Sequence, residues 1–596
     1  MNDDLNISRS KIIGHIYEEN RENANIIRSP EQILWHIGND IMEEVALSKL
    51  PSNLRRLHTS GKVHFHDLSS LPYRSMNCCQ SDARFIAMMG LRAAGTTGRG
   101  VYAKPATRLK SFVHQLSEAM HAAQSNLSGG QGMPHLNVFI APFVADMGYE
   151  EIRKGIQSFI YNLSVLYSSR GSQTTFSSVQ LDVGMPDFLM DEPAYANGGN
   201  VVGTYGDFVE ESQKVLRAFT EEMLKGDGNG HPFLFPNSIY TLRKESFNDE
   251  FEEELELAHR VSAKHGNNYF LNLTNKSTPE DVSVMGCRTQ LGSDWTGNPL
   301  TDCLRCGNLS YVSLNLPRIG LDCRGSEESF FEILGERMDM IREFLALRRG
   351  QAKKLWGLDT FPFLNQRDKN GDLYYNMDNC TDSFGIVGMN DLCHNMLNKG
   401  IETLEGQDFA LRVLDFMNER KNEYSDMNPD IRYSIIGSPA ESACGRFAIM
   451  DKKLYGDKAY CNGSEGEYYY SNSCHFPVDT EYGLIEKIKW ESKTHPLMTG
   501  GAILNAWIGE SYTTWDSLRS FTDKICNTDA RYYTFSSAMT ICDRCDMVMK
   551  GIQDTCVRCG CTDSLRTLDK ITGYLQNTSG WNNSKQREFI DRKRKW

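Results

Sequence analysis

The chain has 596 residues and a formal net charge of −13 at neutral pH. This acidic balance argues against a general nucleic-acid-binding protein, which would carry an excess of Lys and Arg. No apolar run approaches the roughly 18 residues of a membrane span, and the acidic, polar residues 1–4 do not resemble a secretion signal, so we expect a soluble, cytoplasmic protein with no membrane partner.

Three segments have the pattern of amphipathic helices. Each begins at a favourable cap or an acidic first turn and ends at a glycine or proline. The predicted helices span 30–50, capped by Ser29; 207–224, closed by Gly226; and 327–349, capped by Ser326 and ended by Gly350.

Five segments rich in apolar and β-branched residues are predicted as strands: 63–68, 135–143, 176–183, 309–316 and 433–436. Strands separated by helices favour an α/β architecture with much parallel sheet. The composition changes only near residue 541, where cysteines crowd together. We therefore expect a catalytic domain over 1–535 and a small C-terminal module over 536–596.

Two CxxC pairs, Cys542/Cys545 and Cys556/Cys559, are separated by ten residues. Cysteines of a cytoplasmic chain are more often metal ligands, redox groups or buried apolar residues than disulfides. Two such turns can close a tetrahedral Zn²⁺ site of structural type. A redox dithiol or unliganded thiols are the alternatives, and Cys561 can replace one of the four ligands.

Directly after these cysteines, Gly573 precedes Tyr574 and Leu575. A glycine here can be an ordinary turn, because it tolerates backbone angles that other residues avoid. Glycine is also chemically suited to storing a radical, since its α-carbon radical is planar and delocalised into both flanking amides.

Several short motifs accompany Gly573 in a fixed order. They are HFHDL at 64–68, NCC at 77–79, MGCRT at 285–289, GNL at 307–309, SPAE at 438–441, TGG at 499–501 and ITGYL at 571–575. In this order they resemble the anaerobic (class III) ribonucleotide reductases, which are glycyl-radical enzymes. The resemblance extends from about residue 30 to the end of the chain.

The resemblance implies a ten-stranded α/β barrel with a small C-terminal zinc module, in which a glycine loop and a cysteine loop meet. Gly573 would hold the stable radical. Cys78 would become the thiyl radical that takes the 3′-hydrogen of the substrate, and Cys287 would lie on the opposite face of the substrate. Asn308 would bind the ribose hydroxyls, and Met285 would line the same pocket.

The resemblance also implies the substrate, reductant and partners. Ribonucleoside triphosphates would be reduced to deoxyribonucleotides, with formate as the reductant and a radical-SAM 4Fe-4S enzyme as the activase. The substrate phosphates would bind the loop at Ser438, Pro439, Ala440 and Glu441, where backbone N–H groups can hold anions. One of the two nearby histidines, His64 or His66, would be a hydrogen-bonded pocket residue. We assign this role to His64.

A homodimer with nucleotide effectors is also expected, with the region 104–126 as a guess for the effector site. An N-terminal ATP-cone is not expected, because the family motifs begin within the first hundred residues. Direct binding of nucleic acid is not expected either.

The chain departs from the family at three places, one of which is Thr572 at a position where many members have Cys. Lys570 stands where Arg is common in the family. The positive charge is kept, but the two parallel hydrogen bonds that a guanidinium can donate are lost. Cys303 and Cys306 form an additional CxxC, either a dithiol fed by a thioredoxin-like protein or two unrelated loop cysteines. The alternative functions are a dithiol-dependent reductase, a glycyl-radical enzyme of formate-lyase type, and a zinc-ribbon nucleic-acid-binding protein.

Overall fold

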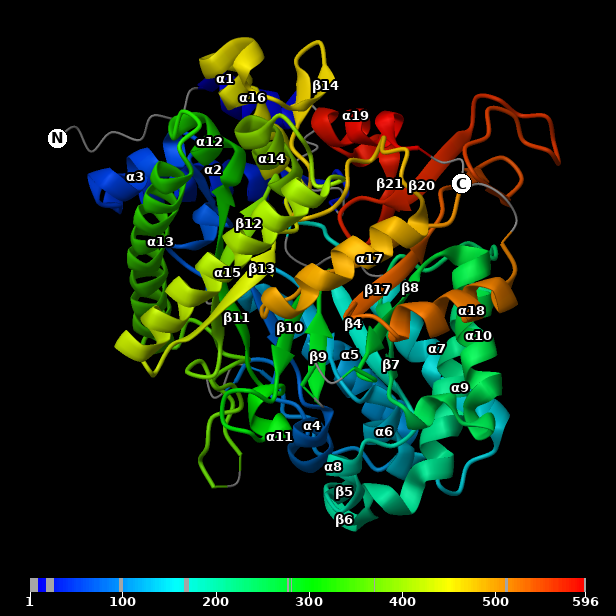
Figure 1. Cartoon of the computed structure of the whole chain (residues 1–596). Coiled ribbons are helices and arrows are strands. Elements are labelled where there is room, and N and C mark those ends of the chain that lie inside the picture. The colour runs from blue at the N-terminus through cyan, green and yellow to red at the C-terminus, as the bar shows by residue number, and fades with distance from the viewer. Residues whose placement is uncertain are drawn as a thin grey trace.

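Figure 1 shows the computed structural model of the chain, which has a mixed α/β fold. It describes residues 9–17, 26–74, 76–95, 100–165, 171–275, 278–279, 281–368, 370–509 and 513–593. Residues 1–4, on which the expectation about a secretion signal rests, lie outside the described residues.

The largest sheet follows a path of ten strands, and β1 (Val63–Phe65) pairs with β11 beside that path. Within the path, β13, β12 and β11 are parallel to one another, and β2, β3, β4, β7 and β8 form a second parallel run. Antiparallel pairs join β11 to β2 and β8 to β17. In order the strands are β13 (Arg432–Gly437), β12 (Thr381–Val387), β11 (Gly307–Asn315), β2 (Cys78–Gln80), β3 (Gln131–Met133), β4 (Ser177–Val183), β7 (Asn237–Leu242), β8 (Asn268–Asn272), β17 (Tyr532–Ser536) and β16 (Leu504–Trp507).

The first and last strands of this path are also connected. Just before β16, the Gly500 N–H donates to the Ile435 carbonyl oxygen of β13 at 2.7 Å. The Gly437 N–H donates to the Gly501 oxygen at 3.0 Å. The backbone groups at this end of β13 are therefore paired rather than left as an open edge.

Helices cover the sheet in two groups, each with its own apolar core. One group packs on the run from β2 to β8: α4 (Ala83–Met89), α5 (Leu109–Asn126), α6 (Leu136–Ile140), α7 (Tyr149–Val165), α9 (Val209–Lys225), α10 (Glu252–His265) and α18 (Trp515–Cys526). The other packs on β11 to β13: α2 (Pro30–Lys49), α3 (Ser52–Thr59), α12 (Leu316–Asp322), α13 (Glu327–Trp356), α14 (Met389–Leu397) and α15 (Leu404–Met427). The groups lie on the right and left of Figure 1.

The remaining elements are short or lie outside the two cores. The other helices are α1 (Arg9–Tyr17), α8 (Asp187–Met190), α11 (Pro299–Asp302), α16 (Ala443–Tyr455), α17 (Leu484–Thr494) and α19 (Asn583–Asp591). Three hairpins pair β5 (Pro193–Ala196) with β6 (Asn200–Thr204), β9 (Val282–Met285) with β10 (Thr289–Gly292), and β14 (Asn462–Ser464) with β15 (Glu467–Tyr469). A separate sheet has the order β19 (Met547–Lys550), β18 (Met539–Cys542), β20 (Leu565–Lys570) and β21 (Leu575–Asn577).

Most predicted elements are confirmed. The helices at 30–50 and 207–224 correspond to α2 and α9, and the Ser29 hydroxyl accepts the Gln32 N–H as the predicted cap. The strands at 176–183, 309–316 and 433–436 correspond to β4, β11 and β13. The strand predicted at 63–68 is shorter, because the chain turns at Asp67, whose φ is 51°.

Two predictions were wrong. Residues 135–143 form α6 and a 3₁₀ turn at Ala141–Phe143 rather than a strand, because a continuous apolar run does not distinguish a buried helix from a strand. The helix predicted to end at Gly350 continues to Trp356 as α13. A glycine inside a helix costs about 1 kcal/mol, and the neighbouring Arg349 is anchored to Asp382 at 2.8 Å.

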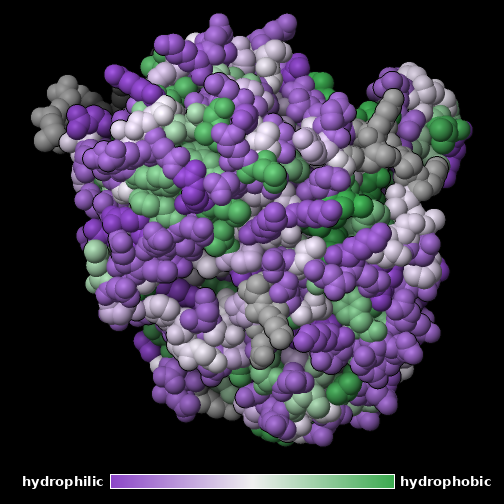
Figure 2. Space-filling model, viewed as in Figure 1, coloured by the Kyte–Doolittle hydropathy of each residue, from purple (hydrophilic) through white to green (hydrophobic). Residues whose placement is uncertain are grey.

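The surface is mostly polar. On the face shown in Figure 2, apolar residues form scattered patches rather than one continuous area. No helix among the described residues is both long and apolar enough to cross a membrane.

Candidate active site

Two hairpin tips meet beside the large sheet. The turn between β20 and β21 carries Gly573, and the Ile571 N–H donates to the Tyr574 carbonyl oxygen at 3.1 Å. Gly573 has φ 140°, a conformation that favours glycine. The turn between β9 and β10 carries Cys287 directly after Gly286, whose φ is 61°.

Gly573 lies next to the backbone and β-carbon of Cys287. A β-carbon built on Gly573 would lie 3.2 Å from the Cys287 β-carbon and 3.3 Å from the Cys287 carbonyl oxygen. The third-nearest atom would be the Ile503 Cδ1 at 3.6 Å. The resemblance instead paired Gly573 functionally with Cys78, so this placement differs from the expectation.

Both cysteines line a cavity of about 180 Å³, which we call the central cavity. Strand β2 supplies Cys78, the β9–β10 tip supplies Cys287, and Tyr574 from the glycine turn closes one side. Pro439 and Glu441 of the predicted phosphate loop also line it. The sequence therefore predicted four of the lining residues as site residues.

The Cys78 thiol lies among polar groups. Its Sγ donates to the Asn77 side-chain oxygen at 2.6 Å and accepts the Gly130 N–H at 3.3 Å. Burial nevertheless raises the pKa of Cys78 to about 12, and burial also raises the pKa of Cys287. Both groups are therefore neutral thiols at neutral pH.

A histidine lines the central cavity, but it is His66 rather than the assigned His64. The His66 ring stacks on Tyr311 with ring centroids 4.0 Å apart, and its Nε2 is 2.7 Å from the Ser313 hydroxyl. Burial lowers the pKa of His66 to about 3, so the ring is neutral. His64 lies behind it, with ring centroids 4.5 Å apart.

The backbone of the predicted phosphate loop is largely occupied by its own hydrogen bonds. The Ala440 N–H donates to the Ser438 oxygen at 2.9 Å, and the Glu441 N–H donates to the Pro439 oxygen at 3.1 Å. Ser442, which lines the central cavity, follows this loop and begins helix α16. The first turn of α16 thus presents backbone N–H groups near the cavity.

Glu441 connects this loop to the glycine turn. Its carboxylate accepts the Tyr574 hydroxyl at 2.7 Å and the Thr572 hydroxyl at 3.5 Å, so it holds the residue on each side of Gly573. Burial raises the pKa of Glu441, although these hydrogen bonds and nearby cations act against the increase.

Four other predicted site residues are buried next to the cavity without lining it. Asn308 is paired in register with Cys78 and donates to the Ser383 hydroxyl at 2.8 Å. Ser438 accepts the Ser313 hydroxyl at 2.5 Å. Met285 and Ala440 are fully buried and are likewise absent from the cavity lining.

Two buried arginines hold the backbone of the glycine turn, and the sequence reasoning missed both in this role. Arg288 donates to the Thr572 carbonyl oxygen. Arg592 donates to the carbonyl oxygens of Lys570 at 2.9 Å and Ile571 at 3.3 Å. Arg288 lies inside the MGCRT motif, which could have identified it as a site residue. No sequence motif marked Arg592.

Arg592 is itself neutralised by buried carboxylates. It donates to Asp569 at 3.2 Å and to Glu588 of helix α19 at 2.8 Å. Its guanidinium also lies 4.4 Å from the ring centroid of Trp507 and 5.2 Å from that of Trp581. The segment after Gly573 thus folds back to anchor the strand before it.

Lys570 occupies the position where the family commonly has Arg. Its ammonium donates to the Thr534 hydroxyl and to the Phe535 carbonyl oxygen, and lies 4.4 Å from the ring centroid of Tyr269. Burial lowers the pKa of Lys570 well below its usual value, although Asp569 opposes this. The amine therefore anchors β20 to β17.

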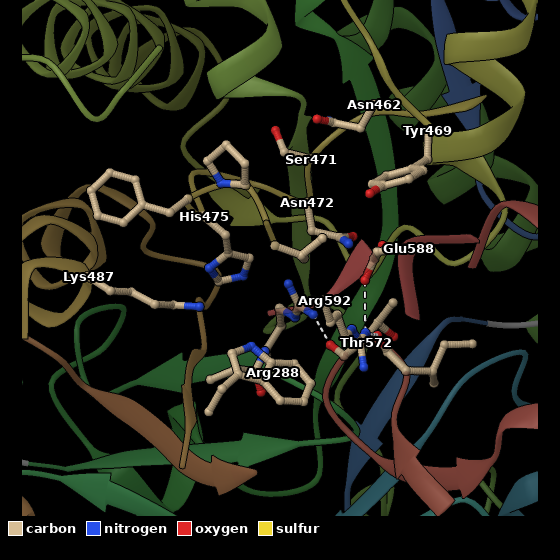
Figure 3. A pocket seen from close by; sticks show the side chains of 16 residues that line it. Arg288, Asn462, Tyr469, Ser471, Asn472, His475, Lys487, Thr572, Glu588 and Arg592 are labelled. Carbon is tan, nitrogen blue, oxygen red and sulfur yellow. Dashed lines mark hydrogen bonds and ion pairs between the residues drawn. The ribbon is translucent and has the colours of Figure 1, made fainter. Parts of the chain in front are cut away.

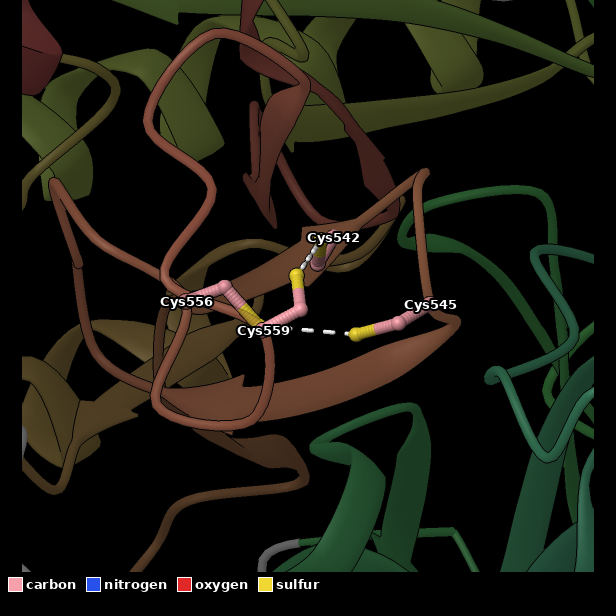
Figure 4. A group of neighbouring side chains, drawn as sticks. All are labelled: Cys542, Cys545, Cys556 and Cys559. Atoms are coloured by element: carbon pink, nitrogen blue, oxygen red, sulfur yellow. Dashed lines mark hydrogen bonds between the residues drawn. The ribbon is translucent and has the colours of Figure 1, made fainter.

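Four cysteines face one another at one end of the C-terminal sheet (Figure 4). Their ligand atoms all lie within 4.8 Å of one another, with Cys542 and Cys559 sulfurs 3.6 Å apart and Cys545 and Cys556 sulfurs 3.5 Å apart. Tetrahedral Zn–S bonds of about 2.3 Å place sulfurs about 3.8 Å apart, so the group fits a zinc ion. Cys561 donates instead to Asp563 at 3.1 Å.

The additional CxxC is buried. Cys303 is 3% exposed and Cys306 is 0% exposed. Their thiols donate to different carbonyl oxygens, at Leu291 and Asp302. Burial raises the pKa of both, which disfavours the thiolate that attacks a disulfide.

The family model for anaerobic ribonucleoside-triphosphate reductases matches residues 22–594. The chain belongs to this family. It is 25% identical to the anaerobic ribonucleoside-triphosphate reductase of Enterobacteria phage T4, over 98% of each chain. It is 24% identical to that of Escherichia coli, over 90% of this chain and 78% of the other. The predicted family and enzyme class are thereby confirmed.

This reductase also has the fold of solved relatives. The Thermotoga maritima anaerobic ribonucleotide reductase in complex with dATP and CTP superposes with a TM-score of 0.72 at 18% identity. The match covers 93% of this chain and 89% of that chain.

Proposed function

We propose that this reductase converts ribonucleoside triphosphates to 2′-deoxyribonucleotides by radical transfer between Gly573 and Cys287. The observation that carries the proposal is the contact between these residues at the wall of the central cavity. A glycine α-hydrogen and a thiol hydrogen have similar bond strengths, so hydrogen transfer between neighbouring residues can be reversible.

The proposed roles of the two cysteines exchange those predicted from the sequence. Cys287 becomes the thiyl that takes the 3′-hydrogen, because its β-carbon and backbone lie next to Gly573. Cys78 lines the same cavity and serves as a neutral hydrogen donor, which its pKa of about 12 supports. The enclosing walls exclude water and oxygen from the radical.

We propose formate as the reductant. Replacing the 2′-hydroxyl with hydrogen and releasing it as water requires two electrons and two protons. Oxidation of formate to CO₂ supplies the two electrons and one proton, and the second proton comes from the solvent. A thioredoxin-like dithiol is the alternative. The burial and raised pKa of Cys303 and Cys306 disfavour those residues as its entry point.

The substrate phosphates are proposed to bind at the start of α16. The N–H groups of Ala440 and Glu441 are already bonded within the loop, whereas the first turn of a helix leaves N–H groups available. Ser442 lies at the cavity wall and marks the position. Asn308, Met285, Ser438 and His64 would support the site from behind the cavity wall, with His66 facing the substrate.

The C-terminal sheet is proposed to be a zinc module that braces the glycine turn. Strand β20 runs from the cysteine group to Lys570. An ion that fixes the cysteine end of this strand would therefore also restrain the glycine turn at its other end. The module would cover 536–596 and the catalytic domain 1–535. The hydrogen bonds between β13 and residues 500–501 support closure of the ten-strand path into a barrel.

A nucleotide effector site is proposed in a cavity of about 700 Å³ beside the start of α5. Arg108, Lys110 and Lys154 offer cations for phosphates, and Phe143 and Phe208 offer rings for a base. The position overlaps the guessed region 104–126. A homodimer is proposed as the functional assembly, and sedimentation velocity with and without dATP tests it.

Anaerobic activation with a radical-SAM activase, followed by EPR and a CTP-to-dCTP assay, tests the proposed function. We expect a glycyl doublet and formate-dependent dCTP. No doublet under competent activation refutes the radical, and a doublet without dCTP favours a lyase.

Activation in D₂O separates the two cysteine assignments. If Cys287 exchanges hydrogen with Gly573, its S–D delivers deuterium and the doublet collapses. We expect the collapse in the wild type and in Cys78→Ser, but not in Cys287→Ser. The reverse pattern returns the thiyl role to Cys78.

A further inference from the structure

A second cavity, which we call the rear cavity, lies behind the glycine turn (Figure 3). Successive residues of the turns face different cavities: Cys287 and Tyr574 line the central cavity, whereas Arg288 and Thr572 line the rear one. The volume is about 40 Å³. At roughly 10–15 Å³ per water, this is room for about three waters or one small ion.

The walls of the rear cavity carry three cations, Arg288, Lys487 and Arg592. Arg592 is paired with Asp569 and Glu588, and Lys487 lies 3.5 Å from a Glu491 oxygen. Arg288 has no ion-pair partner among the residues that the structure describes, although it is only 1% exposed. Glu441 acts on it electrostatically, but the Glu441 carboxylate binds Tyr574.

Arg288 bonds to backbone carbonyls and to the neutral Cys287 thiol, none of which carries a negative charge. Nη1 lies 3.3 Å from the Gly437 oxygen and Nη2 donates to the Thr572 oxygen, while Nε has no acceptor in the described part of the chain. A buried guanidinium without a counter-charge is unfavourable, and an unbonded N–H adds to the penalty. A bound anion would therefore stabilise the buried charge of Arg288, which forms no ion pair with a described residue.

Other wall groups suit the same ligand. His475 binds Glu491 through Nδ1 at 2.9 Å, and its Nε2 has no described partner. Figure 3 shows the side chains of Lys487, His475 and Asn472 directed into the space between them, whereas Arg592 is bonded to Glu588, which also lines the cavity. These groups present positive charge and polar N–H groups from several directions.

We propose that the rear cavity binds one small monovalent anion, with formate and chloride as the candidate sources, and that this anion stabilises the docked glycine turn. The ion would neutralise Arg288, whose Nη2 holds the carbonyl of the residue before Gly573. The volume excludes nucleotides, citrate and gluconate. Binding is independent of the radical; only its importance for catalysis rests on the proposed function.

The test uses the full chain without activation, so it does not depend on radical chemistry. Amide hydrogen exchange of residues 571–576 is measured while sodium formate or chloride replaces gluconate at constant ionic strength. We expect saturable slowing of exchange by severalfold. The ion with the lower half-saturation concentration identifies the source.

Two variants connect the effect to the cavity. Arg288→Met should abolish the saturable response. Lys487→Gln leaves the bonds to the glycine turn intact and should raise the half-saturation concentration at least fivefold. This variant tests the proposal if Arg288→Met does not fold. The proposal is overturned if the exchange rate changes linearly with anion concentration, or if gluconate alone slows exchange equally. An unchanged half-saturation concentration in Lys487→Gln also overturns it.

Discussion

Replacing Arg592 with Met should release the glycine turn without touching its sequence. The substitution removes the Arg592 cation from Asp569, which is 1% exposed, while Glu588 keeps Lys585. Breaking one side of a buried ion pair costs about 3–5 kcal/mol. Two bonds to turn carbonyls, at 2.9 and 3.3 Å, are lost as well, at about 1 kcal/mol each.

Hydrogen exchange mass spectrometry over residues 571–576 measures this loss directly. A decrease of about 3 kcal/mol in the free energy of local opening, the lower end for the ion pair alone, already speeds exchange by roughly a hundredfold, and the lost bonds to the carbonyls add to this. Zinc content should stay unchanged, because the four cysteines do not contact Arg592. Exchange no faster than in the wild type would show that Arg592 does not anchor the turn.

The double variant Arg592→Met/Asp569→Asn is the matched control. Removing both charges eliminates the buried carboxylate that has lost its ion pair with Arg592, so much of the exchange protection should return. The Lys570 N–H bond to the residue-569 side chain, 2.7 Å in the wild type, can be kept by asparagine. A double variant as fast as the single one would place the effect in lost packing against the tryptophans instead of charge.

Three further outcomes are expected. Gly573→Ala should lower the free energy of unfolding by about 1–3 kcal/mol, because φ is 140° and the new methyl meets Cys287, and should give no glycyl EPR signal after activation. Cys542→Ser should lose the bound zinc by metal analysis, while Cys561→Ser keeps it; retained zinc in the first variant would contradict the ligand set. Burial alone would raise the pKa of Glu588, but its ion-pair partners lower it below the ordinary 4.5. The stabilisation that ionised Glu588 contributes is therefore complete above pH 4.5 and is lost as the pH falls through its lower pKa in the folded protein. Urea titrations should show that acidification lowers the free energy of unfolding less in Glu588→Gln than in the wild type.

The sequence predicted those parts of the fold that local patterns determine. Ser29 caps α2 as expected, and β11 occupies the β-rich run after Gly307. The helix at 136–140 was missed because all its residues are buried, which removes any polar face from the pattern. The end of α13 was missed because a tertiary ion pair at Arg349 outweighs the helix-ending tendency of Gly350.

The candidate site was predicted as a set of motifs but not as a geometry. Gly573, Cys78 and Cys287 were all identified, yet which cysteine contacts the glycine depends on how two hairpin tips meet. That contact joins segments far apart in the chain, and no local spacing encodes it. Arg592 illustrates the same limit, since its partners become visible only when the C-terminal segment folds back.

Glu441 belongs to two structures at once. Its backbone lies just before α16, and its carboxylate holds Thr572 and Tyr574 on either side of Gly573. A ligand at the start of α16 and the docking of the glycine turn therefore act on one side chain. Thermodynamic linkage makes such an effect reciprocal: if a docked turn tightens ligand binding tenfold, the bound ligand favours docking by the same factor. The enzyme would thus hold its radical position most firmly when there is something to reduce.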